Sequence, residues 1–331
     1  MKNKINSRSV RMTAVNSRET LTSSLATSMN TVPTDKKTDY SGINFSKIRD
    51  FSTYTFKGAN LTGAIFEYLD FEKGEFIEDP NKIEKLTLPT SKLDFLDFSG
   101  ADLTGASFYE TTMPNANFQG ANCTRASFID TKMHNAKFQG ATISNLNCDG
   151  ADLTGADFSG LTMTNYVYFS YANLTKANFS NTKFKIDPDT YGNIEFIESN
   201  FTDANFSGAN FIGYADFTGG IFKNTNFSNA IIKGSFEAVD RNRDPERKSI
   251  TFENVDFTNA NLEQTFFIAD IDKQIILYNV NFTGTKFPSK RDRDIFIARY
   301  YTLLNEVETD YNYMSVIFRV RPCPESVKCE V

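Results

Sequence analysis

The sequence predicts an all-β fold in which the chain winds into stacked, four-sided coils. Three observations favour this fold class. A large apolar residue recurs at every fifth position, a small residue stands two positions before it, and Asp or Asn with Ser, Thr or Gly fills the places between. Neither the helical period of about 3.6 residues nor the strand period of about two explains this spacing. We therefore interpret each pentad as one side of a coil that ends in a turn.

The longest uninterrupted run of pentads lies between Phe98 and Met163. Alternate residues of an extended segment share a face, so the large residue and the small residue two before it point into the interior together. Asp, Asn, Ser and Gly make the bend, because they hydrogen-bond locally or tolerate unusual backbone angles. Four such bends close a coil of about twenty residues, and side chains twenty apart then stack at the usual strand spacing. The predicted columns are Phe98, Phe118, Phe138 and Phe158; Leu103, Cys123, Ile143 and Met163; Phe108, Phe128 and Cys148; and Met113, Met133 and Leu153.

The same pattern divides the chain into three parts. Residues 1–40 are rich in Ser, Thr and Asn with scattered Lys and Arg, and we expect a disordered leader that is a candidate secretion signal. Residues 41–287 form the repeat domain with loop insertions. Residues 288–331 leave the repeat, and a helical pattern over 289–307 with Ser289 as N-cap predicts a small cap over the open end of the solenoid.

Interruptions of the pattern predict where the coil departs from regularity. The first run counts Phe56, Leu61, Phe66, Phe71 and Phe76 as inward residues. Single-residue slips follow at 166–169 and between 211 and 217, and we interpret both as bulges that keep the interior in phase. Longer breaks at about 77–92, 185–193, 237–249 and 268–275 are expected to be loops on the outside, where function is often carried.

Composition narrows the function classes. The chain has 331 residues, 35 of them basic and 41 acidic, for a net charge of −6. A nucleic-acid-binding protein usually shows a basic excess, so no nucleic acid is expected as a partner. Since no apolar run approaches the ~18 residues of a membrane span, no membrane span is expected either. The oligomeric state stays open.

Residues that could carry catalysis are scarce. The single histidine, His134, follows the inward Met133 and is expected to face solvent. Cys123 and Cys148 occupy inward positions and should act as apolar fillers, while the role of Cys323 and Cys329 stays open. No phosphate loop, dinucleotide motif or metal motif is present in the sequence. We therefore expect no catalytic, cofactor-binding or metal-binding residues and no enzymatic activity.

The repeated pattern A-[DN]-[LF]-x-x, as in Ala151-Asp152-Leu153-Thr154-Gly155, resembles that of the pentapeptide-repeat family over about residues 45 to 287. The resemblance implies a right-handed quadrilateral β-helix. The Ser-rich, basic start and the insertions are similar to those of type III secreted effectors of enteric bacteria. This similarity implies a virulence-related binding scaffold that is secreted into a host cell and engages a host protein, with the bacterial cytoplasm as the other location.

Two other functions stay open. The family's gyrase-binding members mimic DNA with an acidic surface, so inhibition or protection of DNA gyrase is the alternative. In the regular run, however, Glu110 and Asp130 stand against Arg125, Lys132 and Lys137, and this mixture of signs departs from a DNA-like face. The third hypothesis is a purely structural repeat protein without a dedicated partner.

Overall fold

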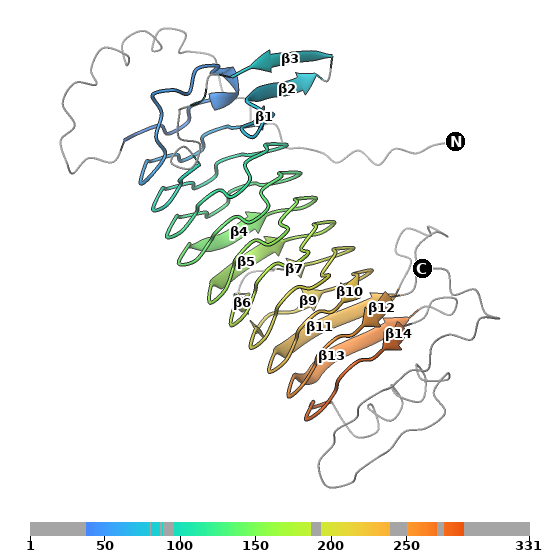
Figure 1. The fold of residues 1–331 in the computed structure, drawn as a ribbon. Helices are drawn as coiled ribbons and strands as arrows, with labels where there is room; N and C mark the ends of the chain where they lie inside the picture. The colour runs from blue at the N-terminus through green and yellow to red at the C-terminus, as the bar shows by residue number, and fades with distance from the viewer. Residues whose placement is uncertain are drawn as a thin grey trace, which may run out of the picture. The chain divides into compact units, whose positions relative to one another are not determined.

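A computed structural model of the chain describes residues 38–79, 81–86, 88, 96–186, 193–238, 250–269 and 275–287. Over these residues the fold is all-β, with a single 3-10 turn, η1 (Phe45–Lys47), near the start. The chain winds into coils that stack one upon the next, from blue to orange in Figure 1. The predicted leader over residues 1–40 lies almost wholly outside the described residues, and so does the predicted cap with Ser289, Cys323 and Cys329.

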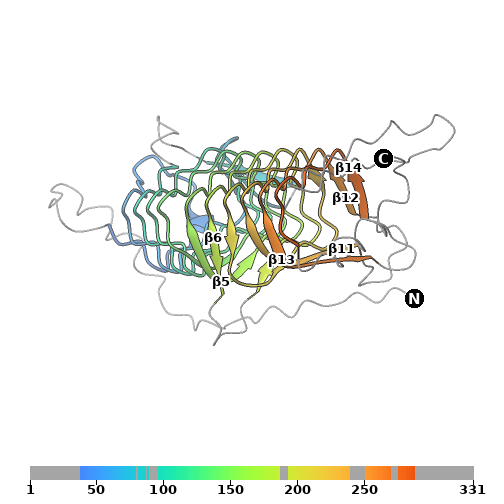
Figure 2. The same ribbon diagram turned by 90° about the horizontal axis from the view of Figure 1, so that it is seen from below.

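Parallel bridges show how the coils are closed. In the regular run each coil is paired to the next through Asp97 to Asn117, Asp102 to Asn122, Ser107 to Ser127 and Thr112 to Lys132. The pairs recur every five residues and join residues twenty apart, so each coil carries four ladders of backbone pairing. Figure 2 shows the coils in succession, with the longer strands on the lower side. The predicted superposition of residue n on residue n plus twenty is confirmed here.

The interior is filled by columns of side chains. Phe118 stacks on Phe98 and Phe138 with ring centroids 5.1 and 4.8 Å apart, and Phe138 stacks on Phe158 at 4.6 Å. Rings of neighbouring columns meet edge to face, a favourable geometry for aromatic pairs. Burial of each Phe contributes about 1.5–3 kcal/mol. Every member of the four predicted columns is buried, at no more than 1 % exposure.

Small and polar residues complete each side of the coil. Ala101 is buried two positions before Leu103 and leaves room for the facing columns. The Asp102 carboxylate accepts the N–H of Thr104 at 3.1 Å, which fixes the bend, and Asn122 of the next coil donates to the same carboxylate at 3.2 Å. Gly105 then adopts a left-handed φ of 67°, a conformation that glycine reaches without strain. The prediction that apolar residues of a pentad point inward and that its polar residues and glycine form the bend is therefore confirmed.

Longer strands appear where the pattern slips. The extra residue lies within β5 (Thr162–Tyr168), between Thr164 and Val167, where the pairing with Ser144 and Leu146 of β4 (Ile143–Asn147) shifts register. The slip is a bulge, as predicted, and the Phe columns continue above it. The eight-stranded parallel sheet also contains β6 (Lys183–Lys185), β7 (Ile194–Glu195), β8 (Asn210–Phe211), β9 (Ala215–Asp216), β11 (Ile231–Ala238) and β13 (Asn261–Ala269). A second parallel sheet contains β10 (Phe222–Lys223), β12 (Ile250–Glu253) and β14 (Ile275–Tyr278).

The first insertion is an antiparallel hairpin, and one prediction about it is wrong. β1 (Leu69–Asp70) pairs with β2 (Glu75–Asp79), which pairs with β3 (Lys82–Lys85). Phe76 therefore lies opposite Leu69 and does not continue the pentad count. The chain reverses because Gly74 adopts a φ of 69°, and the coil resumes where Phe98 stacks on Phe56. The expected insertion boundaries at 237 and 268 also fall inside β11 and β13.

Candidate protein-interaction surface

One of the four sides of the solenoid gathers carboxylates, and we call it the acidic face. Its backbone ladder runs from coil to coil through Ile65, Ser107, Ser127, Asn147, Tyr168, Glu195, Asp216 and Ser235. Because side chains alternate along a strand, the residue two positions after each of these also points outward. The residue three positions after each ladder residue forms the corner, as at Glu110 and Asp130, where φ is 52° and 53°. The carboxylates of this face are Glu67, Glu110, Asp130, Asp149, Glu195, Glu198 and Asp216.

No Lys or Arg occupies these positions among the described residues between 65 and 219, whereas Lys47 stands at the equivalent position after Asn44, which pairs with Ile65 at the start of the ladder. In the regular run Arg125 lies at the corner that precedes the face. Lys132 follows Asp130 by two residues but lies beyond the corner, on the next side of the coil. There its backbone forms parallel bridges with Thr112 and Asp152 of the adjacent coils. The inference from mixed signs is therefore wrong for this side, because the five-residue period distributes neighbours in sequence over different faces.

The carboxylates of the acidic face interact with one another and with tyrosines. Burial, with the charges of Glu195 and Asp130, raises the pKa of Asp149 to about 6 although a Ser170 N–H lowers it. A hydrogen bond to Glu110, with burial and the Glu110 charge, raises the pKa of Tyr109 to about 12. Burial and the Glu195 charge likewise raise the pKa of Tyr168. Negative charges of neighbouring coils thus act on one another across this face, which favours a partner with a basic surface.

Hydrogen bonds from the protein hold several of these carboxylates in place. Ser107 donates its hydroxyl to Oε1 of Glu67 at 2.8 Å, across one coil step. Asp149 accepts the N–H of Ser170 from the next coil, also at 2.8 Å. Asp216 accepts the N–H of Thr218 at 2.9 Å within its own coil. A partner therefore meets preorganised charges on a rigid sheet, which lowers the ordering cost of binding.

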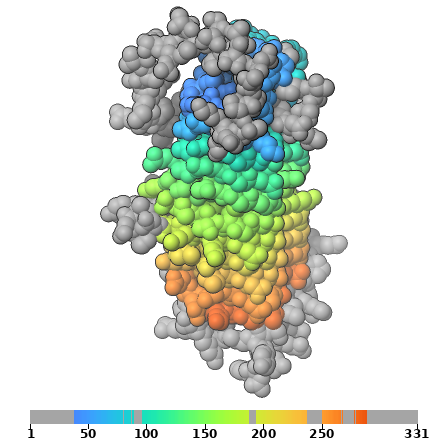
Figure 3. All heavy atoms as spheres, turned by 90° about the vertical axis from the view of Figure 1, so that its left-hand side faces the viewer, coloured from blue at the N-terminus to red at the C-terminus, as the bar shows by residue number. Residues whose placement is uncertain are grey.

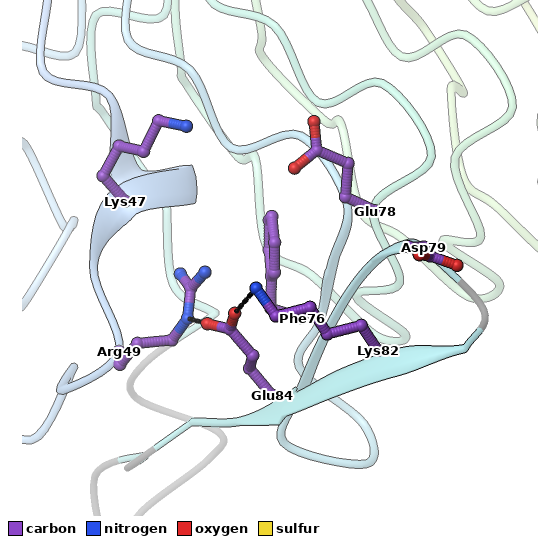
Figure 4. Close-up of a pocket in the computed structure, with 7 residues that line it drawn as sticks. All are labelled: Lys47, Arg49, Phe76, Glu78, Asp79, Lys82 and Glu84. Atoms are coloured by element: carbon purple, nitrogen blue, oxygen red, sulfur yellow. Dashed lines mark hydrogen bonds and ion pairs between the residues drawn. The ribbon is translucent and has the colours of Figure 1, made fainter.

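The hairpin insertion forms a second feature, a hollow of about 220 Å³. The Arg49 guanidinium lies over the Phe76 ring, 4.0 Å from its centroid, and its Nε donates to Glu84 at 2.5 Å. Lys82 pairs with the same Glu84 at 3.3 Å, as the dashed lines in Figure 4 show. Because these charges are paired with one another, the contacts attach β2 and β3 to the first coil. The lining residues are Lys47, Arg49, Phe76, Glu78, Asp79, Lys82 and Glu84.

The structure places the residues that were considered for chemistry. Cys123 and Cys148 are buried, and burial raises the pKa of the Cys123 thiol to about 12 and that of Cys148 well above its usual value. The interpretation of both as apolar fillers agrees with this burial. His134 lies on the outward side after Met133 and is half-buried. Within the described residues no group of three His, Cys, Asp or Glu side chains could hold a metal ion.

No helix among the described residues is long and apolar enough to cross a membrane. The acidic face itself was missed by sequence reasoning. The signal was present, since the twenty-residue period already places Glu110 and Asp130 at equivalent corners of successive coils.

Comparison with known proteins identifies the type of repeat in part of the chain. The family model for pentapeptide repeats matches residues 91–120 and 121–160, with eight copies of the repeat. No curated protein matches the chain.

Several solved structures are similar to the chain. HetL, a pentapeptide repeat protein involved in heterocyst differentiation regulation from the cyanobacterium Nostoc sp. strain PCC 7120, has 16 % identity and a TM-score of 0.22, over 76 % of this chain and 87 % of HetL. Trypsin-treated QnrB1, a plasmid-mediated fluoroquinolone resistance protein, has 16 % identity and a TM-score of 0.26, over 81 % of this chain and 98 % of QnrB1. Rfr23 from the cyanobacterium Cyanothece 51142 has 23 % identity and a TM-score of 0.25, over 40 % of this chain and 87 % of Rfr23.

Figure 3 shows the stacked coils as one surface, on which the colour runs from blue at the first coils to orange at the last. The family model covers the part of the chain in which every fifth residue is an inward side chain and four ladders close each coil. These findings support the conclusion that residues 91–160 contain pentapeptide repeats.

Proposed function

We propose that the protein is a non-catalytic scaffold that binds a partner protein through the acidic face. The observation that carries this proposal is the succession of carboxylates from Glu67 to Asp216 without an intervening Lys or Arg at the described positions of that face. Steps of about 4.8 Å between coils give this surface a length of about 30 Å, comparable to a standard protein interface. Its complement is a basic surface on the partner.

A charge-matched pair of variants tests the proposal. The triple variant E110Q, D130N and E198Q removes three of the seven carboxylates of the acidic face, whereas D102N, D157N and D203N remove the same charge from other sides. Once a partner has been captured and purified, its affinity is measured for the wild type and both variants at several salt concentrations. We expect the first variant to lose about tenfold or more in affinity and part of the salt dependence, because the charges of this face and of the partner attract each other through complementary fields.

The matched variant decides the outcome. An equal loss of affinity in both triple variants would show that only net charge matters, and that the partner does not use this face. Thermal unfolding of all three proteins serves as the control for folding.

DNA gyrase is the second candidate partner, and the continuous acidic face is the observation that favours it. A surface that presents negative charge at six of the seven coils between Ile65 and Asp216 can compete for a DNA-binding channel, as the resemblance to the family's gyrase-binding members implies. The test is a supercoiling assay with wild type and the acidic-face triple variant. Inhibition or protection by the wild type alone supports this candidate, and no effect at micromolar protein removes it.

Delivery into a host cell is proposed on other grounds, namely the Ser-rich and basic composition of residues 1–40. A reporter fused to these residues, in a secretion-competent strain and in a matched secretion-deficient strain, tests this role. Failure of the leader to carry the reporter would remove the host location, the host partner and the virulence role together. We also retain the right-handed winding and the helical cap as parts of the proposal, since the resemblance and the pattern over residues 289–307 favour them.

A further inference from the structure

We infer that a lysine–isoleucine patch, on the side of the solenoid next to the acidic face, binds a short segment of a partner protein that carries both acidic and apolar side chains. The patch consists of Lys183, Lys185, Ile212, Ile231 and Lys233, and all five side chains are exposed. The inference goes beyond the proposed function, because it assigns a second surface with a charge opposite to that of the acidic face.

The patch covers three successive coils on one side of the solenoid. The backbone of Lys183 pairs with that of Asn210 in the next coil, and Asn210 pairs with Ile231 in the coil after it. Because alternate residues of a strand share a face, the residue two positions after each of these three also points outward. These residues are the other members of the patch, so its side chains occupy adjoining positions in two columns about 7 Å apart.

A bulge turns apolar side chains outward at this place. Four residues lie between the partners of Ile231 and Gly234, where β11 itself has two. Bulges re-aim side chains and are frequent next to functional sites. Ile212 and Tyr214 of the bulge are 47 % and 39 % exposed, and Ile231 is 46 % exposed. Three of the six exposed large apolar side chains among the described residues therefore lie in this bulge or beside it.

Equivalent residues of the regular run stabilise the bend of the coil, which the patch residues do not. Asp102, earlier on the same side, accepts the N–H of Thr104 at 3.1 Å. Asn122 of the next coil accepts the N–H of Thr124 at the same distance. Neither lysine nor isoleucine has a side-chain acceptor for such a bond. The exposed apolar groups are thus not needed for the local turn, whereas contact with a partner removes them from water, which is favourable.

The lysines of the patch carry charge that the chain leaves unneutralised. None of the described residues forms an ion pair with Lys183, Lys185 or Lys233. Glu263, on the same side in the following coil, accepts a hydrogen bond from Asn261 at 3.3 Å. Ammonium groups that flank apolar side chains select a segment with carboxylates beside its own apolar residues.

A short segment fits the patch better than an extended anionic surface does. Beyond the corner, the same coils present Glu195 and Asp216 on the acidic face. A membrane or a nucleic acid carries negative charge past the edge of the patch and would meet these carboxylates, and like charges in contact are unfavourable. A short segment contacts the patch alone and avoids this repulsion.

The first experiment uses the full chain and three fluorescent peptides of about twelve residues, which repeat Leu-Glu-Ser, Gly-Glu-Ser or Leu-Lys-Ser. Binding is measured by fluorescence anisotropy at low salt, where charge pairs are least screened. We expect the Leu-Glu-Ser peptide to bind about fivefold more tightly than the Gly-Glu-Ser peptide, because its leucines cover the isoleucines of the patch. The Leu-Lys-Ser peptide matches the acidic face instead, so variants of the patch should not weaken its binding by more than about twofold.

Charge-matched lysine variants locate the binding site. The triple variant K183Q, K185Q and K233Q should lose about tenfold in affinity for the Leu-Glu-Ser peptide, because three attractions to its carboxylates disappear. The triple variant K132Q, K137Q and K176Q removes the same charge from other sides of the solenoid, and it should lose about twofold or less.

A pair of isoleucine variants tests the apolar part of the patch. I212T with I231T should cost about fivefold in affinity for the Leu-Glu-Ser peptide, because apolar contact area is lost. I83T with I221T is the control, since Ile83 and Ile221 are 53 % and 55 % exposed outside the patch. This control should cost about twofold or less. Thermal unfolding of all variants shows whether each one is folded.

Several results would overturn the inference. Equal losses from the two lysine triples or from the two isoleucine pairs would do so, as would absence of binding by the wild type. Sedimentation of the wild type with vesicles of phosphatidylcholine and phosphatidylserine, if the patch lysine triple abolished it, would assign the patch to a lipid surface instead. A dimer in analytical ultracentrifugation that I212T with I231T abolished would assign it to a second copy of the chain. The proposed function is judged separately, because the acidic-face triple variant should keep its binding of the Leu-Glu-Ser peptide.

Discussion

Residues 97–160 and residues 161–287 build the same four columns from coils of different length. In the first region paired residues are twenty apart, as in Asp97 and Asn117. In the second the paired residues are 173 with 200, 183 with 210 and 231 with 261, so the separation reaches 27 and 30. The ring spacing hardly changes, at 4.8 Å for Phe118 and Phe138 and 4.7 Å for Phe179 and Phe206. The interior thus fixes which residues meet, and extra residues leave the coil at its corners.

The two regions are expected to lose the same free energy of unfolding when a column is interrupted. Phe138 stacks between Phe118 and Phe158, and Phe217 stacks between Phe196 and Phe236 at 5.1 and 4.7 Å. Truncation of a buried Phe to Ala costs about 3–5 kcal/mol, because apolar burial is lost and a cavity remains. We expect Phe138→Ala and Phe217→Ala each to lie in this range, as measured by urea unfolding.

The volume-conserving variant Met133→Leu is the control for both truncations. A difference above about 2 kcal/mol between the two Phe variants would show that the regular and the bulged region are not packed alike, against the comparison drawn from ring distances.

Substitution of a glycine is expected to cost a different free energy of unfolding in the two regions. A Cβ added to Gly234 in β11 would clash with the carbonyl oxygen of Ala215 in the neighbouring strand. Nothing lies within 4 Å of a Cβ added to Gly105, although its φ of 67° is left-handed. We expect Gly234→Ala to cost about 3 kcal/mol through overpacking and Gly105→Ala about 1 kcal/mol through backbone strain. Thermal unfolding that ranked Gly105→Ala as the more damaging would contradict this geometry.

Sequence reasoning reached the fold because the interior repeats strictly. Phe98 to Phe158 were placed in one column by arithmetic alone, and the slip at 166–169 was recognised since Phe169 restores the phase. Phe76 was misplaced because a period cannot reveal that Gly74 reverses the chain into a hairpin. The pattern of inward residues therefore predicts the solenoid but not the structure of its insertions.

The candidate site was harder to predict than the fold. Asp130 and Lys132 look like a mixed-charge pair in the sequence, yet a corner separates them onto different sides. The raised pKa of Asp149 depends on burial and on Asp130 and Glu195 from other coils, and no local pattern encodes these neighbours. Composition gives the net charge of a chain, whereas only the assignment of each residue to a side gives the charge of a face.

Buried threonines offer a finer test of whether the two regions use the same bond. Thr131 in the regular region donates its hydroxyl to the carbonyl of Phe108 at 2.8 Å, and Thr265 in β13 donates to that of Ile232 at 2.7 Å. Valine keeps the shape but removes the donor, which should cost about 1–2 kcal/mol at each position. Differential scanning calorimetry of Thr131→Val and Thr265→Val measures this cost. Unchanged stability in either variant would show that the carbonyl has found another donor.

The junction between the regions should give the smallest effect and the opposite sign. Asp149 lies in the last regular coil and accepts the N–H of Ser170 from the first bulged coil. Burial and neighbouring charges raise its pKa from 3.8 to about 6 in the folded chain, so the charged form is unfavourable there. Stability from this group is fully present below the unfolded pKa of 3.8 and is lost as the pH rises through about 6. At pH 7.5, Asp149→Asn should therefore stabilise the fold by about 1 kcal/mol, after a discount for partial solvent screening.

Asp97 provides the matched control on another side of the same region. Burial raises its pKa, but hydrogen bonds from Ser99 and the Lys57 charge outweigh burial, so its pKa is lowered overall. The Asp97 carboxylate therefore stabilises the folded chain at a pH above its unfolded pKa, and this stabilisation is lost as the pH falls through the pKa of the folded state. Asp97→Asn should accordingly destabilise the fold at pH 7.5. Urea unfolding of both variants between pH 3 and pH 7.5 separates the two cases. The contrary outcome is that Asp149→Asn proves destabilising at pH 7.5 as well. That result would show that the hydrogen bond from the Ser170 N–H outweighs the burial and the charge repulsion at Asp149, and that the ionised carboxylate stabilises the junction.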